Sequence, residues 1–275
     1  MNEKWNNESI SIVIPVYNAA PYLERTLNSV KNQTFSEWEL ILVDDASKDA
    51  SVEVIRDWLT KSGYFADKEH GCVKQAEQYG QGKITLLYSK ENRGAAHARN
   101  LGVRHARGRY LVYLDADDYW ESEKLEKQYA FMKKMDCAFS FTGYEFADES
   151  GIRNGKVVHI PECITYEEAL VNTTISTITV MFDRNRIPAE LLYMPEDCAR
   201  EDTATWWKIL KHGYTAYGLD EALSVYCRHR GSQSSNKLKA VLGTYQMYRK
   251  QEQLGVLQTL TCMRKYITGA IKRRL

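Results

Sequence analysis

Hydrophobic and polar residues alternate in two ways along the first 120 positions. Short apolar runs, many of them β-branched, predict strands buried on both faces at residues 10–14, 39–43, 84–88 and 110–114. Between these runs, apolar residues recur every three or four positions, as Leu23, Leu27 and Val30 do, and this spacing predicts amphipathic helices. Strands that alternate with helices form a mostly parallel central sheet flanked by helices. We therefore predict an α/β fold with a Rossmann-like first half.

After residue 120 the alternation is less regular. The spacing predicts helices at 125–132 and 201–210, and strands at 138–141, 156–160 and 179–182. The polar, glycine-containing segment 60–83 predicts a long surface connection. Helical spacing returns from residue 238 to the C-terminus. We expect two halves of one domain, 1–120 and 121–235, followed by a helical tail, 236–275.

Composition excludes several classes of protein. The 37 Lys and Arg residues nearly balance the 36 Asp and Glu residues, which argues against a nucleic-acid partner. The chain has no apolar stretch of the roughly 20 residues that a membrane-spanning helix needs. Its first seven residues do not resemble a secretory signal, so we expect a cytoplasmic location. The six cysteines form no C-x-x-C pair, which favours free thiols over a zinc site or a disulfide framework.

Three acidic residues, Asp115, Asp117 and Asp118, directly follow the strand at 110–114. Carboxylates this close repel one another unless a cation lies between them. Oxygen ligands suit Mg²⁺ or Mn²⁺, which commonly take one or two carboxylates together with substrate phosphates. In the alternative interpretation, Asp117 and Asp118 only cap a helix that begins near Glu121. The size of the cluster favours metal binding.

Other polar residues follow the remaining strands. Ligands of open α/β sheets bind outside the carboxyl ends of the strands, so these residues are expected to share one site. One acid of Asp44 and Asp45 could accept the imide N–H of a uracil, or both could serve the turn and the next helix. Tyr17 could stack on a base or be an ordinary loop aromatic. Arg99 could contact a pyrophosphate, pair with an acid, or lie on a solvated helix face.

Five motifs then occur in order: SIVIPVYN at 11–18, VDDAS at 43–47, NRG with ARN at 92–100, LDADD at 114–118, and ED at 201–202. Together they resemble the family 2 glycosyltransferases, over residues 10–235. Two later phrases, TVMF at 179–182 and YTAYGL at 214–219, resemble the teichuronic-acid and capsular-polysaccharide branch of that family. The resemblance implies a GT-A fold, with a nucleotide-sugar-binding half at 1–120 and an acceptor-binding half at 121–235.

The resemblance also implies a reaction. It is an inverting transfer of a sugar from a nucleotide donor, expected to be a UDP-sugar, to a hydroxyl group of a glycan or lipid-linked acceptor in cell-surface polysaccharide synthesis. Asp202 resembles the catalytic base and Glu201 its neighbour. The implied metal is Mn²⁺ or Mg²⁺, with Asp117, Asp118 and His229 as ligands. The implied donor-binding residues are Pro15, Tyr17, Asp44, Asp45, Arg99, Asp115 and Asp117.

Residues 226–234 resemble a Y-R-x-H…S-x-S segment that closes over the diphosphate in this family. Ser232 and Ser234 match it, but Cys227 stands where the family usually carries arginine. Arg228 or Arg230 could replace that arginine.

The acceptor side and the tail remain open from sequence. Trp206, Trp207 and Tyr144 are candidate sugar-stacking surfaces, although large aromatics at helical positions usually belong to the core. The basic tail, with Arg264, Lys265 and residues 272–274, could lie on an anionic membrane surface at the inner face of the plasma membrane, or pack on its own domain.

Two other functions compete with the transferase. The Asp115–Asp117 pattern also resembles the start of a haloacid-dehalogenase-type phosphatase, but Tyr119 stands where that motif has Thr or Val. A non-catalytic sugar-nucleotide-binding module would explain Tyr17 and Asp45 and leave Asp202 without a role.

Overall fold

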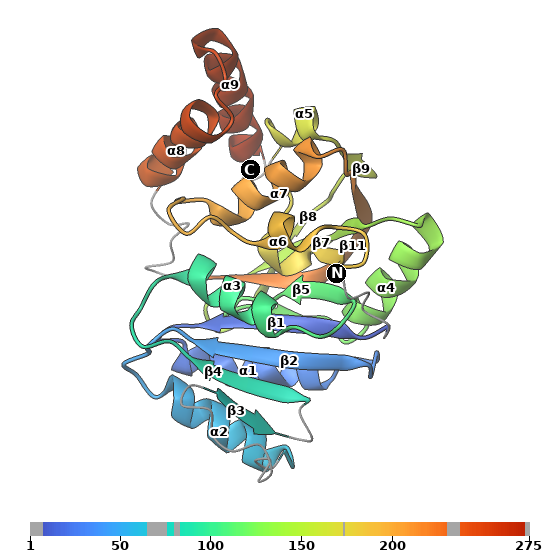
Figure 1. The fold of residues 1–275 in the computed structure, drawn as a ribbon, viewed down its shortest axis with the longest axis vertical. Coiled ribbons are helices and arrows are strands. Elements are labelled where there is room, and N and C mark those ends of the chain that lie inside the picture. Colours follow the sequence, from blue (N-terminus) through green and yellow to red (C-terminus); the bar gives the residue numbers. More distant parts are fainter. Residues whose placement is uncertain (1–7, 65–75, 80–82, 173, 230–236, 273–275) are drawn as a thin grey trace.

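The computed structural model describes residues 8–64, 76–79, 83–172, 174–229 and 237–272 (Figure 1). One sheet runs through them in the order β3-β4-β2-β1-β5-β10-β7-β11-β6, with β8 paired to β7 and β9 to β11. The strands are β1 (Ile10–Val16), β2 (Trp38–Asp44), β3 (Ala76–Tyr79), β4 (Ile84–Tyr88), β5 (Tyr110–Tyr113), β6 (Tyr119–Trp120), β7 (Phe139–Asp148), β8 (Arg153–Val158), β9 (Cys163–Ile164), β10 (Met181–Asp183) and β11 (Ala216–Arg228). The helices are α1 (Ala20–Lys31), α2 (Ser51–Lys61), α3 (Ala95–His105), α4 (Lys124–Met135), α5 (Tyr166–Ala169), α6 (Ala189–Leu192), α7 (Glu201–Lys211), α8 (Lys237–Gln246) and α9 (Val256–Lys272), with a 3₁₀ turn η1 (Thr177–Thr179) and a π-helical turn η3 (Met247–Gln251).

The first half is the parallel sheet that the sequence predicts. β4, β2, β1 and β5 pair in parallel. Ile12 and Ile14 of β1 belong to the cluster formed with α1 and α2, whereas Val13 belongs to the cluster formed with α3. A Cβ at Gly102 would lie 2.3 Å from a methyl group of Val13, so glycine lets α3 approach the sheet closely. Figure 1 shows α1 and α3 on opposite faces of these strands.

The second half extends the same sheet with mixed directions. β10 pairs antiparallel with both β5 and β7, and β7 pairs in parallel with β11. The predicted boundary at residue 120 therefore lies within one continuous sheet. Part of the strand predicted at 179–182 is the turn η1, and β3 lies inside the segment predicted as a connection. Its sequence, AEQY, is short and polar, and it pairs only at the edge with β4.

The predicted helical tail is confirmed as a hairpin of α8, η3 and α9, which we call the C-terminal hairpin. Figure 1 shows it beside α7, at the end of the molecule away from β3. Tyr248 stacks on Trp207 at a centroid distance of 5.2 Å. Trp206 and Trp207 are both 2% exposed and Tyr144 is 7% exposed, so the sugar-stacking hypothesis was wrong for all three side chains. None of the described helices is long and apolar enough to cross a bilayer.

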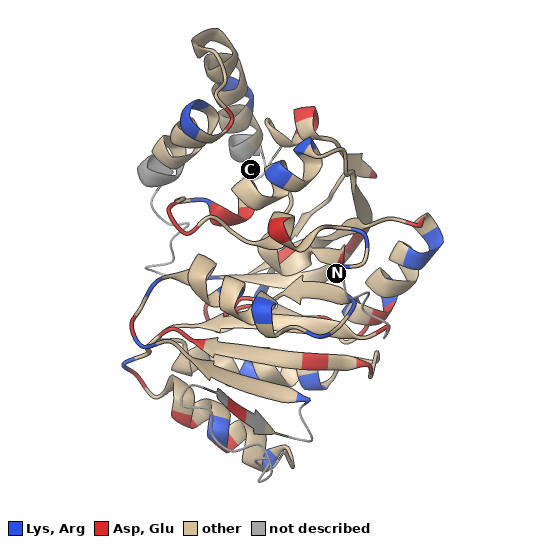
Figure 2. Cartoon of the chain, in the orientation of Figure 1, with Lys and Arg blue, Asp and Glu red and all other residues tan. Residues whose placement is uncertain are grey.

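The distribution of charged residues and the state of the cysteines can be compared with what the composition predicts. Figure 2 shows basic and acidic residues interspersed along the ribbon, as the net charge of +1 leads one to expect. The five cysteines within the described residues are free thiols, as predicted.

Candidate active site

The acidic loop that follows β5 is held by backbone contacts to elements far away in sequence. Asp118 Oδ1 accepts a hydrogen bond of 2.7 Å from the Cys227 amide at the end of β11. From α1, the Thr26 hydroxyl lies 2.7 Å from the Asp118 carbonyl, and Arg25 Nη2 donates to the Asp117 carbonyl at 2.8 Å. Two of these three hydrogen bonds are accepted by backbone carbonyls of the loop, and the third is accepted by the Asp118 carboxylate.

Asp117 meets His229 at the edge of this loop. Asp117 Oδ2 and His229 Nε2 lie 2.7 Å apart, and the His229 ring stacks on Tyr22 with centroids 5.2 Å apart. Burial, and then the charge of Asp115, raises the pKa of Asp117. The pKa of Asp118 is raised well above its ordinary value by burial and by the charges of Asp117 and Asp115. These carboxylates lack sufficient positive charge around them, which is the condition that a divalent cation relieves.

The donor set fits such an ion in part. Among the described residues, no three His, Cys, Asp or Glu side chains are arranged to hold a metal. Two protein ligands are enough for Mg²⁺ when substrate phosphates and water complete the shell. Asp117 Oδ2 and His229 Nε2, 2.7 Å apart, are the pair of side chains here that could serve as two such ligands. Asp118, the third predicted ligand, is 2% exposed and bonded to backbone.

A second acidic cluster begins α7 and is joined to the first by Arg99. Arg99 Nη2 lies 2.6 Å from Asp115 Oδ1, and its Nη1 lies 3.0 Å from Glu201 Oε1. Burial lowers the pKa of the Arg99 guanidinium, but the charges of Asp115 and Glu201 outweigh burial and the net shift is upward. Burial, then the charge of Asp202, raises the pKa of Glu201 despite the arginine. Of the roles left open for Arg99, the structure thus places it between two acids.

Asp202 lies next to Glu201 in the first turn of α7. Its Oδ2 accepts a hydrogen bond of 3.1 Å from the Thr177 hydroxyl, and its Oδ1 accepts one of 2.6 Å from the Thr203 amide. The N-terminus of a helix favours negative charge, and Asp202 stands in the first turn of α7. The side chain is half-buried. Its hydrogen-bond donors fix its orientation.

The carboxyl ends of β1 and β2 carry the other predicted donor-binding residues. Asp45 is 2% exposed, and its Oδ2 accepts hydrogen bonds from the amides of Gly94 (2.6 Å) and Arg93 (3.0 Å). Gly94 has a φ of +90°, which only glycine adopts without strain, so this loop closes on Asp45. Asp44 accepts from the Ser47 amide at 3.3 Å, and burial raises its pKa.

Tyr17, the predicted base-stacking residue, is 45% exposed, while Pro15 is half-buried at the end of β1.

The predicted closing segment is only partly described. Arg228 is exposed, and its guanidinium carbon lies 3.7 Å from the centroid of the Phe146 ring. His229, the next residue, contacts Asp117 instead. Arg230, Ser232 and Ser234 lie outside the described residues.

Sequence reasoning missed Thr26 and Arg25. Thr26 is fully buried between Leu23, Leu27 and Val30 on the apolar face of α1. A hydroxyl at a core position of a helix must find a partner, and this was the signal that could have identified Thr26.

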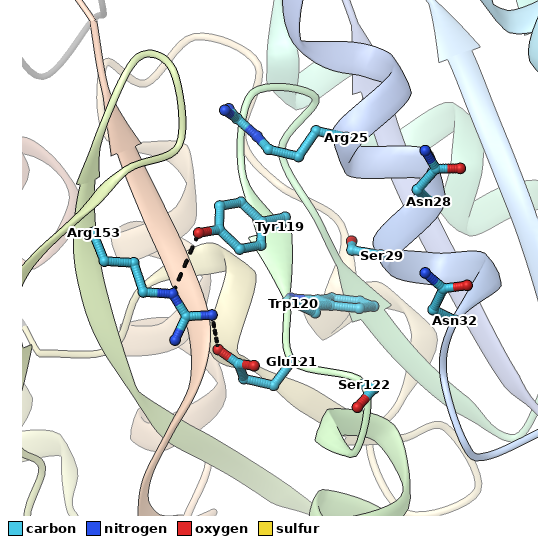
Figure 3. A pocket seen from close by; sticks show the side chains of 9 residues that line it. All are labelled: Arg25, Asn28, Ser29, Asn32, Tyr119, Trp120, Glu121, Ser122 and Arg153. Carbon is cyan, nitrogen blue, oxygen red and sulfur yellow. Dashed lines mark hydrogen bonds and ion pairs between the residues drawn. The ribbon is translucent and has the colours of Figure 1, made fainter.

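A pocket of about 440 Å³ lies between α1 and β6 (Figure 3). Arg25 lines it and also donates to the Asp117 carbonyl, while Arg153 reaches Tyr119 and Glu121 across it. The arginines of this pocket are thus bonded to protein groups. The pocket is lined by Arg25, Asn28, Ser29, Asn32, Tyr119, Trp120, Glu121, Ser122 and Arg153.

Comparison with known proteins bears on fold and family. Two solved structures share the fold at 19% identity. They are Staphylococcus aureus TarS 1-349 in complex with UDP-GlcNAc (TM-score 0.65; 94% of this chain, 71% of that one) and the mannosyltransferase PcManGT from Pyrobaculum calidifontis with GDP-Man and Mn²⁺ (TM-score 0.66; 98% and 75%). Both are GT-A glycosyltransferases, and the predicted fold class is confirmed.

Two curated relatives match this chain over most of their own length. The putative teichuronic acid biosynthesis glycosyltransferase TuaG of Bacillus subtilis is 40% identical over 266 residues, 97% of each chain. WfgD of Escherichia coli, named as a UDP-Glc:α-D-GlcNAc-diphosphoundecaprenol β-1,3-glucosyltransferase, is 33% identical over 84% of this chain and 81% of its own. The family model described as glycosyl transferase family 2 matches residues 11–186. This match replaces the phosphatase hypothesis, and the chain belongs to glycosyl transferase family 2.

Proposed function

We propose that this protein transfers a sugar, with inversion, from a UDP-sugar to a hydroxyl group of a lipid-linked saccharide or glycan in cell-surface polysaccharide synthesis. The observation that carries the proposal is the Arg99 bridge, which joins the acidic loop after β5 to the start of α7. The names of TuaG and WfgD support the class of product and acceptor. The TarS complex with UDP-GlcNAc agrees with a UDP-sugar donor.

Asp117 and His229 are the residues we assign to a divalent ion, Mn²⁺ or Mg²⁺. When bound, such an ion neutralises the charge that develops on the departing diphosphate. Asp118 accepts from the Cys227 amide, so we assign it to holding the loop rather than to contact with the ion. Pro15, Tyr17, Asp44, Asp45 and Asp115 surround the nucleotide in this proposal.

Asp202 is the proposed base. It takes the proton of the acceptor hydroxyl as that oxygen attacks the anomeric carbon, while the bond to UDP breaks on the opposite face. The Thr177 hydroxyl orients the carboxylate by its hydrogen bond. Arg99 keeps Asp115 and Glu201 in place and holds the two clusters at a fixed separation.

The test is Asp202→Asn, which keeps the size and the hydrogen-bond acceptor but cannot take a proton. We expect turnover to fall by 10²–10⁴-fold, about the contribution of a general base, with UDP-sugar binding within twofold of wild type. Asp197→Asn is the matched control, because Asp197 is exposed on the loop that precedes α7. Normal turnover by Asp202→Asn contradicts the assignment. UDP-sugar binding with no UDP release by the wild-type protein would favour the non-catalytic module.

We also propose that the C-terminal hairpin contacts an anionic membrane surface, where a lipid-linked acceptor would be found. Ten large hydrophobic side chains are exposed within the described residues, and six of them lie on this hairpin: Leu242, Tyr245, Val256, Leu257, Leu260 and Ile267. Exposed basic residues accompany them, among them Arg249, Lys250, Arg264 and Lys265. An apolar face flanked by Lys and Arg favours the interface of an anionic bilayer.

Flotation with liposomes that contain phosphatidylglycerol tests this surface. Leu257→Glu, at a side chain that is 83% exposed, is expected to reduce flotation severalfold. Ile152→Glu is the matched control, since Ile152 is 68% exposed on the turn between β7 and β8. Equal flotation of the two variants contradicts the membrane contact.

A further inference from the structure

The C-terminal hairpin contacts Arg200, the residue that precedes α7, and α7 carries the proposed base Asp202. Arg200 Nη1 donates a hydrogen bond of 2.7 Å to the Tyr266 hydroxyl of α9, and the guanidinium carbon lies 5.8 Å from the centroid of the Tyr266 ring. Tyr266 is 8% exposed and Arg200 is half-buried. The contact joins residues 66 positions apart. It therefore depends on how the hairpin packs, not on local sequence.

The other side of Arg200 leads to the proposed base. Its Nη2 lies 3.4 Å from the Thr203 hydroxyl, which in turn lies 3.2 Å from Asp202 Oδ1. Arg200 can donate to both Tyr266 and Thr203, and the Thr203 hydroxyl can then donate to Asp202. Each hydrogen bond in this chain thus has one donor and one acceptor. The chain of hydrogen bonds runs from α9 to the Asp202 carboxylate.

The hairpin is anchored well enough to act as a support. At the other end of α7, Lys211 Nζ lies 2.8 Å from Glu252 Oε2 in the turn before α9. Near Arg200, a Cβ at Gly243 of α8 would lie 3.4 Å from Ala199 Cβ, so the two backbones are in close contact. The N-cap residue of α7, Arg200, makes no side-chain cap hydrogen bond. Contacts with α8 and α9 therefore help to fix the start of the helix.

We propose that Tyr266 is a positioning residue for Asp202, acting through Arg200 and Thr203, so that the C-terminal hairpin is part of the support of the active site. This inference rests on the proposed role of Asp202. Loss of the Tyr266 hydroxyl leaves Nη1 of the half-buried Arg200 guanidinium without its acceptor, so only the longer contact of 3.4 Å to the Thr203 hydroxyl still holds that group. The Asp202 carboxylate then has a less firmly held Thr203 hydroxyl as one of its three donors, while its bonds from Thr177 and the Thr203 amide remain and the donor site at the strand ends is untouched.

The experiment is Tyr266→Phe in the full chain, assayed for UDP release with acceptor and UDP-sugar. We expect kcat to fall about tenfold, the effect of a loss of about 1.4 kcal/mol, with KM for the UDP-sugar within twofold of wild type. Tyr214→Phe is the matched control, because it removes a tyrosine hydroxyl that donates to the Arg186 carbonyl just beyond the other end of α7. Equal kcat losses in the two variants overturn the inference, as does wild-type kcat in Tyr266→Phe.

A second variant keeps the test independent of any folding defect. Arg200→Gln interrupts the same chain one residue closer to Asp202, so adding Tyr266→Phe to it should reduce kcat no further. Multiplied losses in the double variant overturn the inference. Asp202→Asn separates the two proposals. If that variant is inactive while Tyr266→Phe is normal, only the positioning role fails, whereas an active Asp202→Asn removes the base itself.

Discussion

The two acidic clusters differ in how their charges are balanced. The loop after β5 carries Asp115, Asp117 and Asp118, and it is held by hydrogen bonds from the Thr26 hydroxyl, the Cys227 amide and Arg25. The start of α7 carries Glu201 and Asp202, with Arg99 on one side and Arg200 on the other. Among the described residues, only Asp115 of the first cluster is paired with an arginine, whereas the Asp117 carboxylate contacts His229 and that of Asp118 a backbone amide, which suits an incoming metal ion. In the second, Arg99 pairs directly with Glu201, and Arg200 reaches Asp202 through the Thr203 hydroxyl.

Replacing Arg99, which contacts both clusters, has the largest expected effect. Arg99→Met removes the guanidinium from two carboxylates at once and leaves the acids of both clusters without their shared cation. We expect a loss of about 3 kcal/mol in the free energy of unfolding, at the low end for a buried pair because Asp115 is partly exposed. Turnover should fall at least 100-fold, since the two clusters lose their fixed separation. Urea denaturation and UDP release measure the two effects.

Arg104→Met serves as the control, because Arg104 is exposed on the same helix. If Arg99→Met and Arg104→Met unfold at the same urea concentration, Arg99 does not join the clusters in the way that we describe.

The pH dependence of stability distinguishes the clusters more finely. Burial raises the pKa of Glu201 in the folded state, so the folded protein binds its proton more tightly than the unfolded chain does. Stability from this group is therefore present below the unfolded pKa and is lost as the pH rises through the folded pKa. Glu201→Gln retains an acceptor for Arg99 but does not titrate. We expect it to flatten the fall of Tm between pH 4.5 and neutral by a few degrees.

Glu190→Gln, at an exposed position on α6, should leave the slope of Tm against pH unchanged. A wild-type slope in Glu201→Gln would mean that the raised pKa has no effect on folding.

The sequence predicted the acidic residues better than the contacts that hold them. The run at 110–114 predicted a buried strand, and the acids after it had to lie at the carboxyl end of the sheet. The positions of Asp115, Asp117 and Asp118 followed from that local pattern. His229 and Asp202 came only from the family resemblance, because nothing local shows that residues 112 positions apart, such as Asp117 and His229, will meet.

The second half was harder to predict for the same reason. β11 pairs with β7, β6 and β9, and its burial changes along its length, so its sequence has no regular period. The contact between Arg200 and Tyr266 depends on how a terminal hairpin packs on α7. Neither residue stands in a motif. Tertiary packing, rather than local pattern, determines these parts of the site.

The variant with the smallest expected effect tests whether the hydrogen bond from the Thr26 hydroxyl helps to hold the first cluster. Thr26→Val has the same shape as threonine but removes the hydroxyl that lies 2.7 Å from the Asp118 carbonyl. We expect a loss of about 1–2 kcal/mol in the free energy of unfolding, as for a buried carbonyl left without its donor. If Asp117 holds the proposed metal ion, a shift of the loop near it should raise the Mn²⁺ concentration for half-maximal turnover severalfold. Thr26→Ser keeps the hydroxyl and should restore the metal response while losing stability through its missing methyl group. A Thr26→Val protein that is less stable but needs no more Mn²⁺ would show that α1 supports the fold without shaping the loop proposed to hold the metal.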